Sequence, residues 1–384
     1  MNRCLVFAIL GIALTGCNTG VTPLPIVVGH VSDNTRPDKA GEQAELGIRL
    51  ALAELSKDDA LAEALGGRKI LVHHTDTRGE LDAFESQAVR LVAVNRCITL
   101  FGGLSAKEVA KLDHAQTPLL TFYGGPVVGA SNQVFYLGMA PSRQGEVLAK
   151  IIPDHAKTDR VAILLDERRA DLATLAEIFQ KTLAIARKHA EAKPTNVVIQ
   201  RFGKDVKWAE IVETMQSQKP QVVLFAGGVQ DFNGWHKVFR GGRIIDPPTV
   251  LYAGDDGDQR LFDLDHDPKT SVLFATAFHA DPANPKIAAF LKAYQDAFQT
   301  DADVHAALAY DGFRLFVEAL KKAQPQPTLE RLREEIQKTK DFEGLTGPLS
   351  VNAERLVDRP LSVVHWQNGK LTAVKTFPVV TVSK

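Results

Sequence analysis

The sequence alternates between short apolar runs and amphipathic segments, and this alternation limits the chain to a small set of folds. In the first part, the apolar runs are PIVVGHV, KILVHHTD, CITLFGG and TPLLTFYGG, each ending in Gly, Asp or a short polar stretch. Helical patterns lie between most of them; in AELGIRLALAEL, for example, Ala44, Ile48 and Leu55 share one face of a helix. The pattern predicts βαβ units that build a parallel sheet.

A second series of the same kind follows APSRQGEVLAKIIPDHAKTD, with the runs VAILLD, NVVIQRF, QVVLFAGG, TVLYAGDD and SVLFATAF. The chain then reads as helices up to about residue 338 and as strands joined by turns after that, with Asn368-Gly369 as a hairpin turn. A chain of 384 residues exceeds one compact core of typical domain size. We therefore expect two α/β lobes of similar build.

The loops at the carboxyl ends of the strands are where ligands bind in open α/β sheets. In this chain they are the segments GHVSDN, HTD, GGLS, FYGG, LDER, AGGVQD and AGDDGD. Two lobes whose loops face each other form a cleft, and the cleft is the expected binding site.

The loop GGLS opens a predicted helix. Ser105 followed by Glu108 fits a capping box, and Gly102-Gly103 lets the backbone approach a ligand. A carboxylate could then meet free N–H groups at the positive end of the helix. We include Gly103, Leu104 and Ser105 in the candidate site, although helix capping alone accounts for Ser105 equally well.

The loop AGDDGD offers carboxylates at Asp255, Asp256 and Asp258. A carboxylate there could bind the ammonium group of a small ligand, and a turn that only caps a helix is the other interpretation. A calcium loop fits less well, because the spacing lacks the repeated odd-position ligands followed by a glutamate.

Other chemistries find little support in the sequence. His73 and His74 point to opposite faces of a strand, so they do not share a metal ion easily. The chain has no G-x-S-x-G elbow and no P-loop, and we expect neither an enzyme nor a bound cofactor or metal. A net charge of −1 lacks the basic excess of a nucleic-acid binder.

The N-terminus reads as an export signal. Arg3 precedes LVFAILGIAL, and about 10 apolar residues are typical of a signal peptide, whereas a membrane-spanning helix needs roughly 20. The tetrapeptide LTGC resembles a bacterial lipobox, which implies a signal peptide over 1–16, lipid on Cys17 and a tether over 17–22. The membrane leaflet stays open, as does an ordinary secretory signal. Cys97 would then be the one remaining thiol, which we expect to be buried.

Several segments together resemble the leucine/isoleucine/valine-type substrate-binding proteins of ABC transporters. They include "AYD" at 309–311, FEGLTG at 342–347, the later "NGK", and upstream LVHHTDTRGELDAFESQAVRLV and ITLFGGLS. The resemblance implies the type I periplasmic binding protein fold, with two doubly wound parallel-sheet lobes joined by three crossovers. It places lobe 1 at 23–142 and 276–355, and lobe 2 at 143–275 and 356–384.

The resemblance also implies site residues. The family holds a ligand carboxylate with a serine that here is Ser105, and the amine with an acidic residue that here is Asp256. The family's second hydroxyl contact falls near Gly125, and its aromatic positions in the second lobe are not aromatic here. Tyr123, Gln230 and Phe232 are the residues that could fill this gap by position.

The function implied is a solute-binding lipoprotein of an ABC uptake transporter. It would capture an amino acid, amide or related small polar solute, be anchored on the periplasmic side of the cell envelope, and present its closed lobes to a membrane permease. The alternative is a lipoprotein of the same fold that senses a ligand or binds an envelope partner without transport. The missing aromatic residues favour that alternative.

Overall fold

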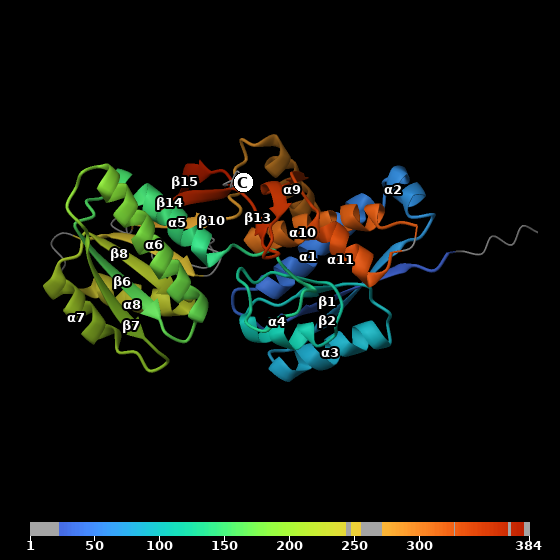
Figure 1. Ribbon diagram of the computed structural model, residues 1–384, viewed down its shortest axis with the longest axis horizontal. Coiled ribbons are helices and arrows are strands. Elements are labelled where there is room, and N and C mark those ends of the chain that lie inside the picture. The colour runs from blue at the N-terminus through green and yellow to red at the C-terminus, as the bar shows by residue number, and fades with distance from the viewer. Residues whose placement is uncertain (1–22, 243–246, 255–270, 326, 368–369, 380–384) are drawn as a thin grey trace, which may run out of the picture.

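The computed structural model describes residues 23–242, 247–254, 271–325, 327–367 and 370–379, and two sheets dominate it (Figure 1). Figure 1 shows them side by side, each with helices packed on both faces. Among the described residues, no helix is both long and apolar enough to cross a lipid bilayer.

The first sheet has five parallel strands in the order β2-β1-β3-β4-β5. The strands are β1 (Ile26–Ser32), β2 (Ile70–Asp76), β3 (Leu100–Gly102), β4 (Leu119–Thr121) and β5 (Val134–Tyr136). The three central strands are almost wholly buried, which explains why they appear in the sequence as uninterrupted apolar runs.

Helices cover both faces of this sheet. On one side lie α3 (Leu81–Ala93) and α4 (Ala106–Asp113), and on the other α1 (Ala40–Leu55) and α10 (Val304–Lys322). Adjacent residues of a strand face opposite sides of the sheet. Leu100 packs with α3 and α4, while the Phe101 ring lies 5.8 Å from that of Phe313 on α10. The remaining helices near this sheet are α2 (Asp59–Ala64), α9 (Pro285–Phe298) and α11 (Leu329–Gln337).

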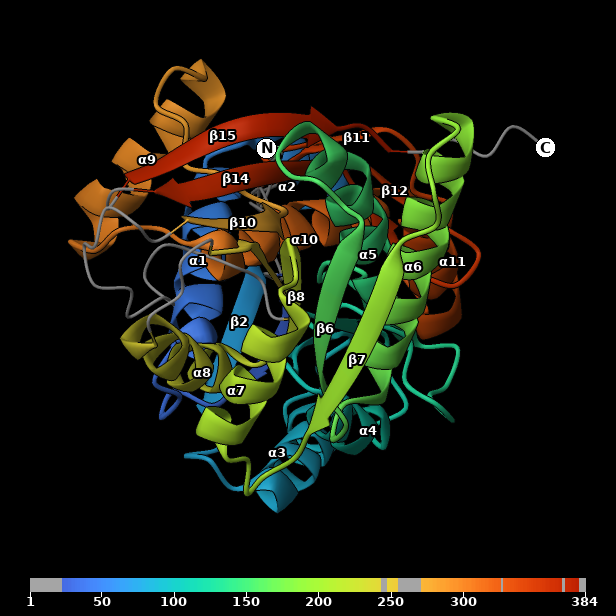
Figure 2. The ribbon, with the colours of Figure 1, turned by 90° about the vertical axis from the view of Figure 1, so that its left-hand side faces the viewer.

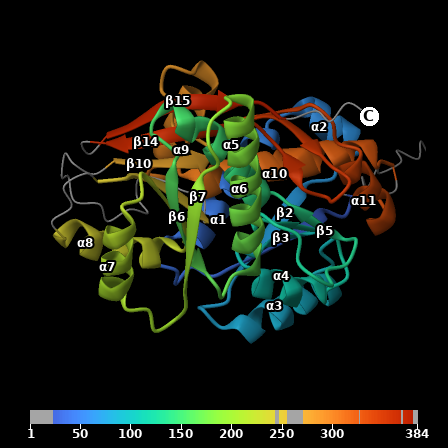
Figure 3. The ribbon, with the colours of Figure 1, turned by 60° about the vertical axis from the view of Figure 1, so that its left-hand side comes forward.

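The second sheet has seven strands in the order β15-β14-β10-β9-β8-β6-β7. They are β6 (Arg160–Asp166), β7 (Asn196–Phe202), β8 (Val222–Gly227), β9 (Thr249–Gly254), β10 (Ser271–Thr276), β14 (Leu361–Gln367) and β15 (Lys370–Phe377). The first five are parallel, whereas β14 and β15 run antiparallel to their neighbours (Figure 3). The predicted hairpin turn at 368–369 lies outside the described residues.

Two helix pairs sandwich the second sheet. Figure 2 shows α5 (Pro141–Ile151) and α6 (Ala170–His189) on one side of β6 and β7, and α7 (Trp208–Gln218) and α8 (Val229–Gly241) on the other. The α8 side contains an aromatic core in which Phe225 packs against Phe232 and Trp235, with ring centroids 5.3 and 5.5 Å away.

The chain passes between the two sheets three times. It crosses from β5 to α5, from β10 to α9, and from the small antiparallel sheet of β11 (Phe342–Gly344), β12 (Gly347–Val351) and β13 (Val357–Asp358) to β14. We call the unit around the first sheet, with β11–β13, the first lobe, and the other the second lobe. The two α/β lobes confirm the prediction from the sequence pattern, and the three crossovers confirm what the family resemblance implies.

A buried arginine fastens two of these crossovers to each other. Arg359, between β13 and β14, is 4% exposed, and its Nη2 donates to the carbonyl oxygen of Leu137, just after β5, at 2.7 Å. Its Nη1 donates to the hydroxyl of Thr346 at 3.2 Å. One side chain thus joins the first and third crossovers.

Candidate ligand-binding site

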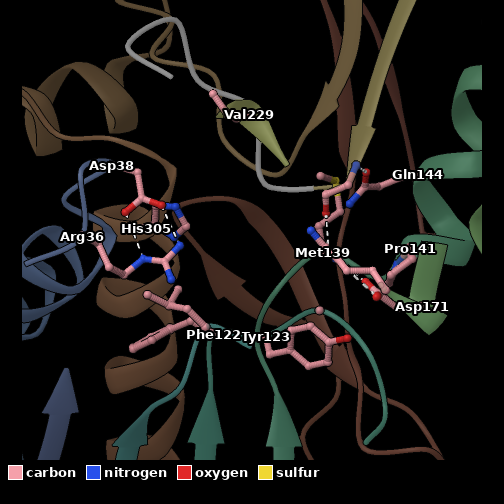
Figure 4. A pocket seen from close by; sticks show the side chains of 14 residues that line it. Arg36, Asp38, Phe122, Tyr123, Met139, Pro141, Gln144, Asp171, Val229 and His305 are labelled. Carbon is pink, nitrogen blue, oxygen red and sulfur yellow. Dashed lines mark hydrogen bonds and ion pairs between the residues drawn. The ribbon is translucent and has the colours of Figure 1, made fainter. Parts of the chain in front are cut away.

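A pocket of about 570 Å³, part of it open to solvent, lies between the two lobes (Figure 4). Its walls come from the loops after β1, β3, β4 and β5, the start of α10, the first turns of α5, α6 and α8, and the end of β9. These are the carboxyl ends of parallel strands and the helix starts that follow them, which is where the sequence pattern predicts a ligand site.

An arginine–aspartate pair projects into the pocket from the first lobe. Arg36 Nη2 lies 2.7 Å from Asp38 Oδ2, and its Nε lies 3.0 Å from Oδ1, which makes the pair bidentate. Burial alone would raise the pKa of Asp38, but the hydrogen bonds and charge of Arg36, the backbone N–H of Ala40 and the nearby His305 together hold it below its usual value. Asp38 is therefore a carboxylate.

A second arginine–aspartate pair stands in the second lobe at the start of α6. Arg169 Nη2 lies 2.8 Å from Asp171 Oδ2 and 3.4 Å from the carbonyl oxygen of Gly254 at the end of β9. The N–H of Gly254 in turn donates to the side-chain oxygen of Gln144 on α5 at 3.0 Å. The backbone of Gly254 therefore links the Arg169–Asp171 pair to the end of β9 and to α5.

The two pairs give the pocket a balanced set of charges, with two guanidinium groups and two carboxylates. Each lobe offers both a charged donor and a charged acceptor. Such a lining complements a ligand that has both a hydrogen-bond donor and an acceptor, such as a zwitterion or an amide, better than it complements a lone anion or cation.

Tyr123 lies at the boundary between the lobes. It follows β4 in the first lobe, and its hydroxyl points toward the Asp171 carboxylate of the second lobe. Burial, followed by the charge of Asp171, raises the pKa of Tyr123 to about 12, so the phenol stays protonated. Figure 4 shows its ring extending beneath the pocket toward Asp171. Tyr123 and Leu104 are the sequence-predicted residues that line the pocket among those described.

Ser105 forms the capping box that the sequence predicts. Its hydroxyl accepts the N–H of Glu108 at 3.3 Å, and Glu108 Oε2 accepts the N–H groups of Leu104 at 2.6 Å and Ser105 at 3.1 Å. The N–H groups expected to bind a ligand carboxylate are thus occupied by the helix's own side chain. Burial raises the pKa of Glu108, although these hydrogen bonds and the charge of Arg36 oppose the shift.

The other predicted residues lie outside the pocket lining. Gly103 has a φ of +82°, and its carbonyl accepts the N–H of Phe122 and the hydroxyl of Thr121, so it serves the backbone. Gly125 follows the lining residue Gly124, and Gln230 is exposed in the first turn of α8.

Phe232 corrects a sequence expectation. It is fully buried in the aromatic core of the second lobe, facing Phe225, and not toward the pocket. The position along α8 explains the difference, because Val229, the first residue of the helix, lines the pocket, whereas Phe232 lies nearly one turn further into the aromatic core. Asp256 and Cys17 lie outside the described residues.

The sequence carries a signal for the two ion pairs. Both have the pattern Arg-x-Asp directly before or at a helix start, in RPD at 36–38 and RAD at 169–171. Both stretches belong to loops at the carboxyl ends of predicted strands. Gln144 and His305 carry no comparable signal, because they lie within helices and reach the pocket through tertiary packing.

Comparison with known proteins gives the family. The model of a family described as "Periplasmic binding protein" matches residues 25–370, and the chain belongs to this family. Its members are extracytoplasmic binding proteins and not enzymes. No curated protein sequence matches the chain.

Solved structures share the fold at low identity. The branched-chain amino acid transporter substrate-binding protein LivJ from Streptococcus pneumoniae, in complex with isoleucine, is 20% identical, with a TM-score of 0.75, covering 92% of this chain and 99% of its own. The leucine-binding protein LivK from Thermotoga maritima is 18% identical, with a TM-score of 0.74 and coverage of 92% and 99%. An ABC transporter solute-binding protein from Rhodopseudomonas palustris, in complex with 3,4-dihydroxybenzoic acid, is 19% identical, with a TM-score of 0.75 and coverage of 93% and 98%. They show that the chain has the type I periplasmic binding protein fold.

Proposed function

We propose that this protein is the solute-binding lipoprotein of an ABC uptake transporter and that it captures an amino acid, amide or related small polar solute between its lobes. The observation that carries the proposal is the pair of Arg-x-Asp ion pairs, Arg36–Asp38 and Arg169–Asp171, which face one pocket from opposite lobes. Solved relatives of the same fold bind isoleucine or dihydroxybenzoic acid. The balanced lining supports the first of these ligand types, since a benzoate lacks a positive group.

Asp256 stays in this proposal as the partner of the ligand's amine. Gly254 lines the pocket, and Asp256 follows it by two residues in the sequence. Ser105 stays as a candidate for the carboxylate, although its hydroxyl already accepts a hydrogen bond from Glu108. Cys17 would carry the lipid that keeps the protein beside its permease.

The test is a thermal-shift screen of the soluble form, residues 18–384, which contains every described residue. The panel contains amino acids, amides, urea, polyamines, small carboxylates and hydroxybenzoates. A solute at 100 times its dissociation constant stabilises the fold by about 2.7 kcal/mol, which is several degrees for a domain of this kind. We expect zwitterions or amides to raise Tm; a response to hydroxybenzoates alone would contradict the solute class.

Variants then locate the site. Arg169→Gln and Asp256→Asn should abolish the solute-dependent shift, whereas Arg187→Gln should keep it. Arg187 is a matched control, because it pairs with Asp159 at 2.8 Å at the opposite end of the second sheet. Ser105→Ala separates its two roles: loss of the shift means ligand binding, and a lower Tm with an intact shift means helix capping alone.

A chain that responds to no solute would favour the alternative, a lipoprotein that binds an envelope partner without transport. The occupied helix start at Glu108 is the observation that favours this second candidate. Co-purification of the lipidated protein with a permease would decide for transport.

A further inference from the structure

Three side chains that can bind metal meet inside the first lobe, away from the pocket. His30 on β1 and His74 on β2 are direct neighbours in the parallel register, so both side chains project from the same face of the sheet. Glu45 lies on α1, which packs on that face. In the described part of the chain, these three form the group of histidine, cysteine and carboxylate ligands that is compact enough for one ion.

The distances fit a metal centre. Nδ1 of His30 and Nδ1 of His74 are 3.1 Å apart, and one ligand atom from each of the three residues lies within 4.8 Å of the others. Two nitrogens bound to one tetrahedral zinc at 2.0–2.1 Å are about 3.4 Å apart, so small side-chain rotations suffice to admit the ion. The two imidazoles meet edge to face, with their centroids 5.2 Å apart.

Both histidines are neutral. His30 is 1% exposed, and burial, with the charges of His74 and Arg49, holds its pKa well below the usual value. Burial also lowers the pKa of His74 to about 4, against an opposing effect of Glu45. The two Nδ1 atoms share a hydrogen bond, so one of them carries a proton, and metal binding requires this proton to move to Nε2 of the same ring.

Arg49 is the group that competes with a cation at this place. Its Nη2 lies 2.5 Å from Glu45 Oε1, one turn away on α1. The Arg49 side chain is 54% exposed, whereas that of Glu45 is 15% exposed. The arginine can therefore move into solvent while the carboxylate stays in place, and this is the rearrangement that metal binding requires.

We propose that His30, His74 and Glu45 bind one zinc ion in the first lobe, with water at the fourth position. Two imidazoles and one carboxylate are a donor set that zinc accepts, with an open position for water. The ion would tie β1, β2 and α1 together beneath the loop that carries Arg36 and Asp38. The proposal is independent of the solute and its transport.

The geometry also explains why His73 is not a ligand. His73 points to the opposite face of β2 from His74 and is exposed. The second imidazole comes instead from the neighbouring strand, 44 residues earlier in the chain. His73→Gln is therefore a matched control for His74→Gln, because it changes the same residue type at the adjacent position of the same strand.

The test is a zinc titration of the untagged soluble form, residues 18–384, stripped of metal and set in competition with a chromogenic chelator. We expect one zinc per chain in the wild type and in His73→Gln, with affinities within about twofold of each other. His74→Gln and Glu45→Gln should each bind about 100-fold more weakly, since even the outer partners of metal ligands are worth 10- to 100-fold.

Two further readouts keep the outcome clear. Cobalt in place of zinc should give the visible absorption of a tetrahedral site in the wild type and His73→Gln, and not in the other two variants. Circular dichroism checks that each variant is folded, and Glu45→Gln, altered at the edge of the site, covers the case in which His74→Gln is unstable. Absence of stoichiometric zinc binding by the wild type, or wild-type affinity in both folded ligand variants, would overturn the proposal.

Discussion

Asp311 accepts the backbone N–H of Leu345 through its Oδ1, at 2.6 Å. Its Oδ2 accepts the N–H and the hydroxyl of Thr346, at 2.8 and 2.7 Å. Asp311 belongs to α10 and is fully buried. A Cβ on Gly344 would lie 2.7 Å from Oδ2, so the turn between β11 and β12 needs glycine there. The AYD and FEGLTG motifs therefore contact each other directly, through the carboxylate of Asp311.

Replacing Asp311 with Asn should destabilise the protein without touching the solute site. The amide keeps one acceptor oxygen and turns a donor toward the N–H groups of the β11–β12 turn, leaving at least one of them unpaired. The expected loss is about 2–3 kcal/mol in the free energy of unfolding, measured by urea denaturation. Asp296→Asn, which breaks an exposed pair with Lys292, should cost less than about 1 kcal/mol. Equal losses in both variants would contradict this account.

Glu108 should make the stability of the first lobe fall as pH rises. Its folded pKa is raised by burial, so the folded state holds the proton more tightly than the unfolded chain. The contribution is complete below the unfolded pKa of about 4.3 and is lost as pH rises through the folded value. Glu108→Gln keeps a capping side chain without the titration. The difference in unfolding free energy, wild type minus variant, should therefore decrease from pH 4 and level off near neutrality; a difference that grows with pH would refute it.

Tyr123→Phe should open the cleft in the ligand-free protein. The change removes the hydroxyl that points from the first lobe toward the Asp171 carboxylate of the second and leaves the ring in place. Small-angle X-ray scattering should give a larger radius of gyration, and affinity for any captured solute should fall about threefold to tenfold. Tyr136→Phe removes a hydrogen bond inside the first lobe, to the N–H of Val127, and should leave the radius unchanged. An unchanged radius in Tyr123→Phe would mean that this contact does not hold the lobes.

Cys97 should be unreactive in the folded protein. It is buried, and burial raises the pKa of its thiol to about 11, so almost none is thiolate at pH 7.5. The soluble form, residues 18–384, contains no other cysteine. Ellman's reagent should therefore detect no rapidly reacting thiol in buffer and one in 6 M guanidinium. Fast labelling of the native protein would show that the strand region around Cys97 opens readily.

The fold could be predicted because its signals are local. Strands buried on both faces must be apolar throughout, and the helices between them show the 3.6-residue period, as Ala44 and Ile48 do on α1. The capping box at Ser105 and Glu108 is equally local and is confirmed. The Arg-x-Asp patterns at 36–38 and 169–171 are local as well, but that both ion pairs face one pocket is set by how the lobes meet, and no local pattern carries that information.

Two residues illustrate where prediction from the sequence ends. Phe232 is one of several aromatic residues on α8, and only the packing of the helix shows that it faces the sheet. His74 has an adjacent histidine in the sequence, yet its spatial partner is His30, which strand pairing supplies. In both cases the deciding contact joins segments that are distant along the chain or depends on how a whole helix is rotated.

The bond from Arg359 to Leu137 limits how the molecule can move. Three separate connections would let the lobes bend, shear and twist, because each strand could slide past the others. With two of them joined by a buried guanidinium, sliding one past the other must break a hydrogen bond in the interior. We therefore expect the two joined connections to move together as one unit whenever the lobes change their relative position.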